Sequence, residues 1–174
     1  ILSGGPRSVS DADAPDIDLD HLLSLDVPVL GICYGMQLLN KKHGGRVEPG
    51  KTREYGPAEL RPEGGCGLFD KVSASSQIWM SHSDTCTKLP EGAEVIGRNE
   101  DGVPVAVQLS SKVFGIQFHP EVTHSHEGKR VLDNYLSMVD DPPRFNMDSF
   151  KEALIESVRE EIGDREVVCG VSGG

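Results

Sequence analysis

The stretch Val29-Leu30-Gly31-Ile32-Cys33-Tyr34-Gly35-Met36-Gln37 decides the fold, because it is an apolar run broken by a cysteine with a glycine two positions to either side. Residues 27–32 have the continuous apolar pattern of a short buried strand, and residues 36–44 have the pattern of a helix that ends at glycine. Cys33 then lies in a strand–turn–helix elbow, in which flanking glycines allow close packing. A helix start favours the thiolate form, so Cys33 is a candidate nucleophile.

A second apolar stretch, residues 112–118, predicts another buried strand, and it leads directly into His119-Pro120-Glu121. A histidine at a strand end, with a carboxylate two residues on, supplies a base and the group that orients it. Taken alone, Cys33 also fits a small buried side chain, and His119 with Glu121 also fits a surface pair. Taken together, the two segments predict nucleophilic catalysis.

The remaining pattern predicts an α/β fold. Residues 16–25 and 131–139 carry apolar side chains at helical spacing, whereas residues 93–97 and 103–107 have the pattern of hairpin strands. Strands that bear reactive residues at their carboxyl ends and are covered by helices are typical of an open sheet. We therefore predict an open, mostly parallel sheet flanked by helices.

Composition narrows the classes of partner. The 174 residues include 17 basic and 28 acidic side chains, and the net charge of −11 argues against a nucleic-acid partner. No apolar stretch approaches the roughly 20 residues of a membrane span. The four cysteines show no paired spacing, which predicts a reducing, cytoplasmic setting. His124 and His126 follow His119 closely, but they lack zinc-type spacing with the cysteines, so we predict no metal site.

A domain boundary is expected where the helical pattern of residues 131–139 stops. Residues 1–139 form the first predicted domain, residues 140–147 with their two prolines a linker, and residues 148–174 the beginning of a second α/β domain. In this last part a capping box at Ser149 predicts a helix to Ile162, and the apolar run at 166–171 predicts a buried strand.

The motif around Cys33, together with Phe118-His119-Pro120-Glu121, resembles the class I (triad) glutamine amidotransferases, whose fold is flavodoxin-like. Further segments support the resemblance: Ile1-Leu2-Ser3-Gly4-Gly5-Pro6, Arg53-Glu54-Tyr55-Gly56, Trp79-Met80-Ser81-His82-Ser83-Asp84 and Glu121-Val122-Thr123-His124. Among the members of this family, the sequence most closely resembles those that supply ammonia for the ATP-dependent amination of XMP to GMP. It runs over the whole chain.

The resemblance implies specific residue roles. Cys33 is the expected nucleophile, His119 the base and then the acid, and Glu121 the group that orients His119. The oxyanion hole is expected at Gly5 and at the backbone N–H of Tyr34. Four residues are expected to bind glutamine, the last three in a loop: Gln37, Ser81, His82 and Asp84.

The resemblance also implies a reaction and its partners. L-Glutamine is hydrolysed through a γ-glutamyl thioester, a step that needs no cofactor, whereas the complete enzyme uses ATP, Mg²⁺ and XMP through a synthetase domain and is expected to be a homo-oligomer. Ser172, Gly173 and Gly174 resemble the opening of an ATP-pyrophosphatase loop that binds nucleotide phosphates. Because the family's domain starts with further elements before Ile1, we expect a fragment truncated at both ends.

Three alternatives remain. One is the amidotransferase domain of another biosynthetic synthase, which the ending Ser172-Gly173-Gly174 disfavours. Another is a catalytically silent module that binds glutamine or a partner subunit, which an intact Cys33, His119 and Glu121 disfavour. The third is a cysteine peptidase of the related γ-glutamyl hydrolase type, which shares the same triad logic.

Overall fold

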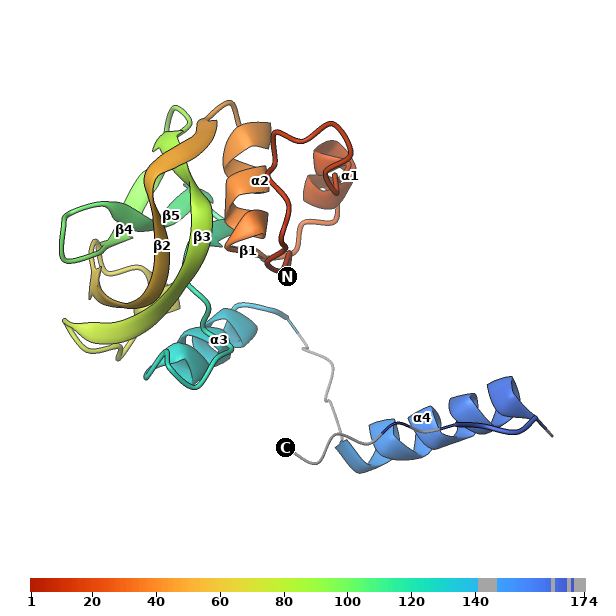
Figure 1. The fold of residues 1–174 in the computed structure, drawn as a ribbon. Coiled ribbons are helices and arrows are strands. Elements are labelled where there is room, and N and C mark those ends of the chain that lie inside the picture. The colour runs from red at the N-terminus through yellow and green to blue at the C-terminus, as the bar shows by residue number, and fades with distance from the viewer. Residues whose placement is uncertain (141–146, 164, 169, 171–174) are drawn as a thin grey trace. The chain divides into compact units, whose positions relative to one another are not determined.

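The computed structural model describes residues 1–140, 147–163, 165–168 and 170 (Figure 1). The chain divides into two compact units, Ile1–Asp140 and Asp141–Gly174. The two units are described one after the other.

The first unit is built on a six-stranded sheet with the strand order β1-β6-β5-β4-β2-β3. The sheet is mixed, and the fold is α/β. Its strands are β1 (Val29–Ile32), β2 (Arg46–Pro62), β3 (Ser76–Lys88), β4 (Glu94–Arg98), β5 (Pro104–Ser110) and β6 (Val113–Ile116). The predicted strands around Cys33 and before His119, and the predicted hairpin, correspond to β1, β6 and the pair β4–β5.

The expectation of a mostly parallel sheet was wrong. Only β1 and β6 pair in parallel, while the β2–β3, β2–β4, β4–β5 and β5–β6 pairs are antiparallel. The loops 99–103 and 111–112 are far shorter than the dozen or so residues that a parallel crossover needs. The antiparallel pairing of β4 with β5 and of β5 with β6 therefore follows from loop length, whereas the parallel pair joins segments that lie far apart in the chain.

Strands β2 and β3 form a long, curved antiparallel ladder, which Figure 1 shows as two neighbouring ribbons. The sequence pattern predicted hairpin strands at residues 93–97 and 103–107 but not this ladder. Register shifts occur near Arg46 and between Pro49 and Glu54. Such irregularities interrupt the two-residue alternation of apolar and polar side chains that identifies a strand in a sequence.

Helices cover both faces of the parallel pair. Helix α2 (Tyr34–Lys42) packs Met36 and Leu39 against Val29, and helix α3 (Gly128–Ser137) packs Val131 and Tyr135 against Leu30. Neighbouring strand residues point to opposite faces, so the two helices lie on opposite sides of β1. All residues of β1 and β6 are buried, as expected for strands covered on both faces.

The chain start runs along the free edge of β1. Leu2 forms an isolated parallel bridge with Gly31, its N–H donating to Leu30 O at 2.8 Å and its carbonyl accepting from Ile32 N at 2.8 Å. This pairing brings the following Ser3-Gly4-Gly5-Pro6 segment beside the carboxyl end of β1. Helix α1 (Leu19–Ser24) comes next and begins at Asp18, whose side chain caps His21 N.

The second unit contains helix α4 (Met147–Ile162), which agrees with the predicted helix and ends before Gly163 at a φ of 55°. The predicted strand at residues 166–171 was wrong for its described residues: residues 166–168 and 170 are not in a strand, and Val168 is 99% exposed. A strand needs a paired neighbour, and none is aligned with these residues. Ser172, Gly173 and Gly174 lie outside the described residues.

Candidate active site

Cys33 lies in a strained turn between β1 and α2. Its φ of 52° and ψ of −105° lie outside the regions that side-chain-bearing residues prefer. A side chain on Gly31 would place its Cβ 2.6 Å from the backbone carbonyl of Gly35, and one on Gly35 would lie 2.2 Å from Leu2 O. Both glycines are therefore required for the close approach of strand, helix and chain start that forms the elbow.

The parallel pair brings Cys33 to the segment that carries His119. Strands β1 and β6 end in register at Ile32 and Ile116, and Cys33 N donates to Ile116 O at 2.8 Å. The Cys33 thiol lies 3.6 Å from the backbone carbonyl of Ser81 on β3, which accepts its hydrogen bond. The nucleophile thus lies between the carboxyl end of β1 and strand β3.

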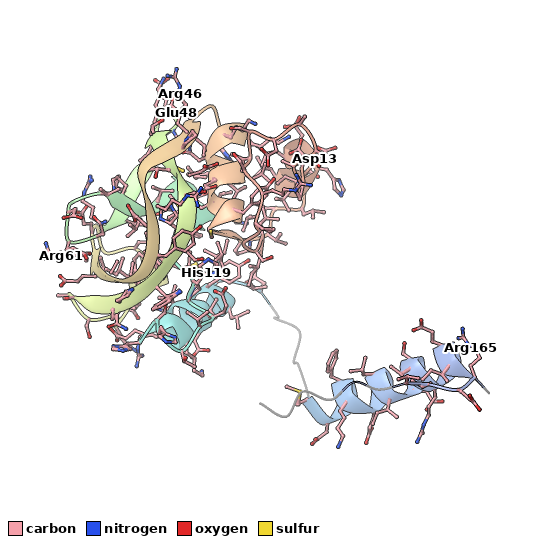
Figure 2. The ribbon with its side chains drawn as sticks, in the orientation of Figure 1. Asp13, Arg46, Glu48, Arg61, His119 and Arg165 are labelled. Atoms are coloured by element: carbon pink, nitrogen blue, oxygen red, sulfur yellow. The ribbon has the colours of Figure 1, made fainter. Side chains whose placement is uncertain are left out.

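His119 connects Cys33 with Glu121. Its Nδ1 donates to Glu121 Oε1 at 2.7 Å, and its side chain is also hydrogen-bonded to Cys33. Figure 2 shows the labelled His119 beside the lower part of the sheet and above α3. The three side chains that the sequence predicted as a triad are therefore brought together, in the order in which a nucleophile, a base and an orienting acid act.

The ionisation of His119 differs from that of a free imidazole. The hydrogen bond to Cys33, assisted by that to Glu121 and opposed by partial burial, raises the pKa of His119 to about 9. An imidazolium beside a cysteine favours the thiolate. By contrast, burial raises the pKa of the Cys86 thiol to about 12 and also raises that of Cys66, so neither is a reactive thiol at neutral pH.

Cys33 and His119 face a cavity of about 370 Å³, large enough for a small amino-acid substrate. The cavity lining contains nearly all the predicted site residues. It is formed by Gly5, Pro6, Arg7, Cys33, Tyr34, Gln37, Tyr55, Ser81, His82, Ser83, Asp84 and His119. Glu121 contacts His119 from outside this lining and is half exposed.

The predicted oxyanion donors lie on two sides of Cys33. Tyr34 is the first residue of α2, so its N–H belongs to the group that has no acceptor within the helix. Gly5 lies against Tyr34, because a Cβ at Gly5 would be 3.8 Å from Tyr34 Cγ. The arrangement can direct backbone donors toward the sulfur's target, and the role of each donor stays a prediction.

Three of the four predicted glutamine-binding residues lie on a strand and not in a loop, which corrects the sequence interpretation, whereas Gln37 lies on α2. Ser81, His82 and Asp84 are part of β3, where they pair with residues of β2. Gln37 is buried, and its Nε2 donates to Asp84 O at 2.9 Å and to Gln117 Oε1 at 3.2 Å. This makes Gln37 a support for the Asp84 backbone as well as part of the cavity lining.

His82 is similarly occupied by protein groups. Its Nδ1 is hydrogen-bonded to Asp84 O at 2.9 Å, and its Nε2 lies 3.3 Å from Glu54 Oε2 without the alignment of a hydrogen bond. The Asp84 carboxylate accepts from Ser8 Oγ at 2.5 Å and borders the cavity. The structure therefore places the Asp84 carboxylate at the cavity wall, with His82 bonded to the Asp84 backbone, and a role of Asp84 in substrate binding stays a prediction.

Several contributors were missed by the sequence reasoning. Gly4 is one: a Cβ at Gly4 would lie 2.9 Å from His119 Cε1 and 3.5 Å from Cys33 Cβ, so a side chain there would displace the pair. Ser8 and Glu54 are others, because they contact Asp84 and His82 from segments remote in sequence. The pair of adjacent glycines was the available signal for Gly4. Ser8 had none.

No group of three or more potential metal-binding side chains is present in the described part of the chain. Of the helices that the structure describes, none has the length and apolar character needed to cross a bilayer.

This fold and site define a class of protein. Residues 1–139 match the family model of glutamine amidotransferase class-I, and the chain belongs to that family. The solved structure of a glutamine amidotransferase from Methylobacillus flagellatus is similar, with a TM-score of 0.58 and 26% identity over 78% of this chain and 55% of the other.

Two curated relatives indicate which kind of glutamine amidotransferase the chain resembles. The chain is 46% identical to a glutamine-hydrolysing GMP synthase of Nitratidesulfovibrio vulgaris and 45% identical to that of Streptococcus mutans. Each match covers 100% of this chain and 34% of the relative. The chain is thus a member of the glutamine amidotransferase family that is similar to part of these GMP synthases, and it spans about a third of the length of the curated relatives that it matches.

The ionisation of His119 predicts a pH dependence. The imidazolium is present below a pH of about 9 and is lost above it, so kcat/KM for glutamine should fall as the pH rises through about 9. Glu121→Gln removes a group that raises this pKa, so the alkaline fall should move to lower pH and the rate should drop by about 10- to 10⁴-fold. Glu91→Gln, in an exposed turn, is the control. A variant within twofold of wild type, with an unmoved profile, would remove Glu121 from the triad.

Proposed function

We propose that Cys33, His119 and Glu121 hydrolyse the side-chain amide of L-glutamine in the cavity beneath β3. The observation that carries this proposal is the joint placement of Cys33 and His119 at a cavity that Asp84 also lines, with the Glu121 carboxylate hydrogen-bonded to His119. The family match supports glutamine as the substrate.

The first half of the reaction uses the thiolate and the imidazolium. The Cys33 sulfur attacks the amide carbon, and the oxyanion that forms accepts from the N–H groups of Gly5 and Tyr34, each donor contributing roughly 3 kcal/mol. The C–N bond then breaks as His119 gives its proton to the departing nitrogen. Ammonia leaves, and the γ-glutamyl group remains on sulfur as a thioester.

The second half restores the pair. Neutral His119 takes a proton from water, the resulting hydroxide adds to the thioester carbon, and the C–S bond breaks to return the thiolate. Glutamate leaves, and its new carboxyl proton passes to solvent. Glu121 holds the Nδ1–H of His119 throughout, which keeps Nε2 directed at the reacting atoms.

We further propose that the ammonia aminates XMP, activated by ATP with Mg²⁺, in the full-length protein. The relatives named as GMP synthases support this, as does the ending Ser172-Gly173-Gly174, which fits the start of an ATP-pyrophosphatase loop. On this proposal residues 1–139, 140–147 and 148–174 are amidotransferase domain, linker and the start of the synthetase domain. A cytoplasmic homo-oligomer remains part of the proposal.

The test compares substrates in one assay. The full-length protein is supplied with L-glutamine or with a γ-glutamyl peptide, and glutamate release is measured with and without XMP and ATP. Glutamine hydrolysis coupled to GMP formation is the expected result. Preferential cleavage of the peptide would instead favour a γ-glutamyl hydrolase, and GMP formation from neither glutamine nor ammonium would remove the synthase proposal.

Asp84→Ala should weaken glutamine binding selectively. A charge-assisted hydrogen bond between the Asp84 carboxylate and the substrate α-ammonium contributes about 1.5–3 kcal/mol, so the KM for glutamine should rise about 10- to 100-fold. Synthesis from ammonium salts should not change. Asp133→Ala, which removes an exposed carboxylate paired with Lys129, is the matched control. An unchanged KM would identify Asp84 as a structural residue, and the assignments of Ser81 and His82 would weaken with it.

A further inference from the structure

Ser125 is a buried hydroxyl residue that the proposed chemistry does not use. It follows the Glu121 turn, is 5% exposed, and contacts two backbone groups at once. Its Oγ donates to His119 O at 2.5 Å and accepts from Trp79 N at 3.1 Å. A hydroxyl can both donate and accept, and here both capacities are used inside the protein.

These contacts complete a two-sided attachment of His119 to strand β3. His119 N donates to Trp79 O at 3.0 Å, which is a direct backbone bond. The carbonyl of His119 reaches the same residue only through the hydroxyl of Ser125. Both backbone polar groups of the base are therefore tied to Trp79.

Strand β3 also lies against the nucleophile. The backbone carbonyl of Ser81, two residues after Trp79, is 3.6 Å from the Cys33 sulfur. The base and the nucleophile therefore both lie against one short segment of β3. Any movement of His119 relative to Trp79 is consequently a movement relative to the sulfur.

The sheet alone does not fix His119. Strand β6 ends at Ile116, three residues earlier, and the Glu121 carboxylate orients the ring of His119 without holding its backbone. The His119 ring nevertheless packs closely against the chain start, because a Cβ on Gly4 would lie only 2.9 Å from Cε1 of His119. A small backbone shift would therefore change the alignment of base and thiol.

The backbone of Ser125 is itself well placed for this role. Its N–H donates to Val122 O at 3.0 Å, and its carbonyl accepts from Gly128 N at 3.0 Å at the start of α3. A Cβ at Gly128 would lie 2.0 Å from Pro120 O, so the whole turn is closely packed. The hydroxyl is held by a rigid turn and does not depend on a mobile loop.

We propose that Ser125 is a positioning residue of the glutaminase, whose hydroxyl fixes the backbone of His119 to strand β3 so that the imidazole stays aligned with Cys33. This inference rests on the proposed hydrolysis of glutamine. It acts through His119 and involves no contact with the substrate.

The experiment measures glutamine hydrolysis by the full-length protein as Ser125→Ala, Ser125→Thr and wild type. Misplacement of a catalytic group by about 1 Å costs about 10²-fold, so Ser125→Ala should lower kcat by about 10- to 100-fold while KM stays within twofold. Ser125→Thr keeps the hydroxyl and should recover most of the rate. Ser137→Ala is the control, since it removes a hydroxyl that bonds only a carbonyl within α3.

The outcomes separate this inference from the proposed function. If wild type releases ammonia from glutamine and Ser125→Ala keeps kcat within twofold, the inference is overturned while the function stands. A wild type that does not hydrolyse glutamine overturns both. Circular dichroism checks folding; should Ser125→Ala be unfolded, Ser125→Cys, which is nearly isosteric but a weak donor, must show the loss of kcat with KM retained. A normal kcat in folded Ser125→Cys would then overturn the inference.

Discussion

Replacing Cys33 by alanine in the full-length protein should abolish glutamine-dependent GMP synthesis while leaving synthesis from added ammonium salts largely intact. Among the described residues that line the cavity, Cys33 is the only one with a thiol that can form the thioester, and added ammonia bypasses that step. The loss should reach the limit of detection, at least about 10⁴-fold. Both activities are measured by GMP formation from XMP and ATP.

Cys66→Ala is the matched control, because the pKa of the Cys66 thiol is raised by burial and the residue lies outside the cavity lining. It should keep both activities. Equal loss of glutamine-dependent and ammonium-dependent synthesis in Cys33→Ala would mean that Cys33 is needed for structure and not for chemistry. In that case the strained turn at Cys33 would have no role in catalysis.

His119→Ala should cause a loss of glutaminase activity comparable with that of Cys33→Ala, because residues of a triad act as a unit and the removal of either partner disables both. The variant should also lose selective alkylation of Cys33 by a glutamine-like reagent, since the imidazolium beside the sulfur is gone. His21→Ala, an exposed histidine on α1, serves as the control. Retention of more than about a tenth of the wild-type rate would exclude His119 as the base.

The parts of the site that follow the parallel strands β1 and β6 could be predicted from the sequence. Cys33 and His119 each follow a continuously apolar run, and glycines bracket the cysteine, so the local pattern contains both the strand and the chemistry. The pairing itself rests on the rule that parallel strands present their carboxyl ends at one edge, and β1 and β6 confirm it. The elbow then follows from sterics at Gly31 and Gly35.

The remaining parts depend on contacts that no local pattern records. The resemblance to the family implied that Asp84 lies in a loop, yet pairing with β2 makes its segment part of strand β3. The polar run from Ser81 to Thr85 lacks the alternation that identifies a half-buried strand in a sequence. Gly4 lies against His119 although more than a hundred residues separate them in the sequence. Ser125 follows His119 by six residues, and its hydroxyl donates to the His119 carbonyl. Their importance becomes visible only when those segments are brought together.

The two wrong fold expectations have the same origin. A mostly parallel sheet was inferred from two apolar strands, although the short loops before β5 and β6 allow only antiparallel partners there. The apolar run at residues 166–171 has strand propensity, but Val167 and Val168 are exposed and no strand is aligned with them in the described residues. Propensity indicates what a segment favours, and pairing decides what it forms.

L-Glutamine labelled with ¹⁵N in the side-chain amide tests directly whether Cys33 is the nucleophile of a glutaminase. The full-length protein is supplied with this substrate, XMP and ATP, and the label is followed into ammonia and GMP alongside glutamate. We predict that labelled nitrogen and glutamate appear in equal amounts with wild type and that neither appears with Cys33→Ala. Labelled product formed equally well by Cys33→Ala, or formed by neither protein, would contradict the assignment of Cys33 as the nucleophile of a glutaminase.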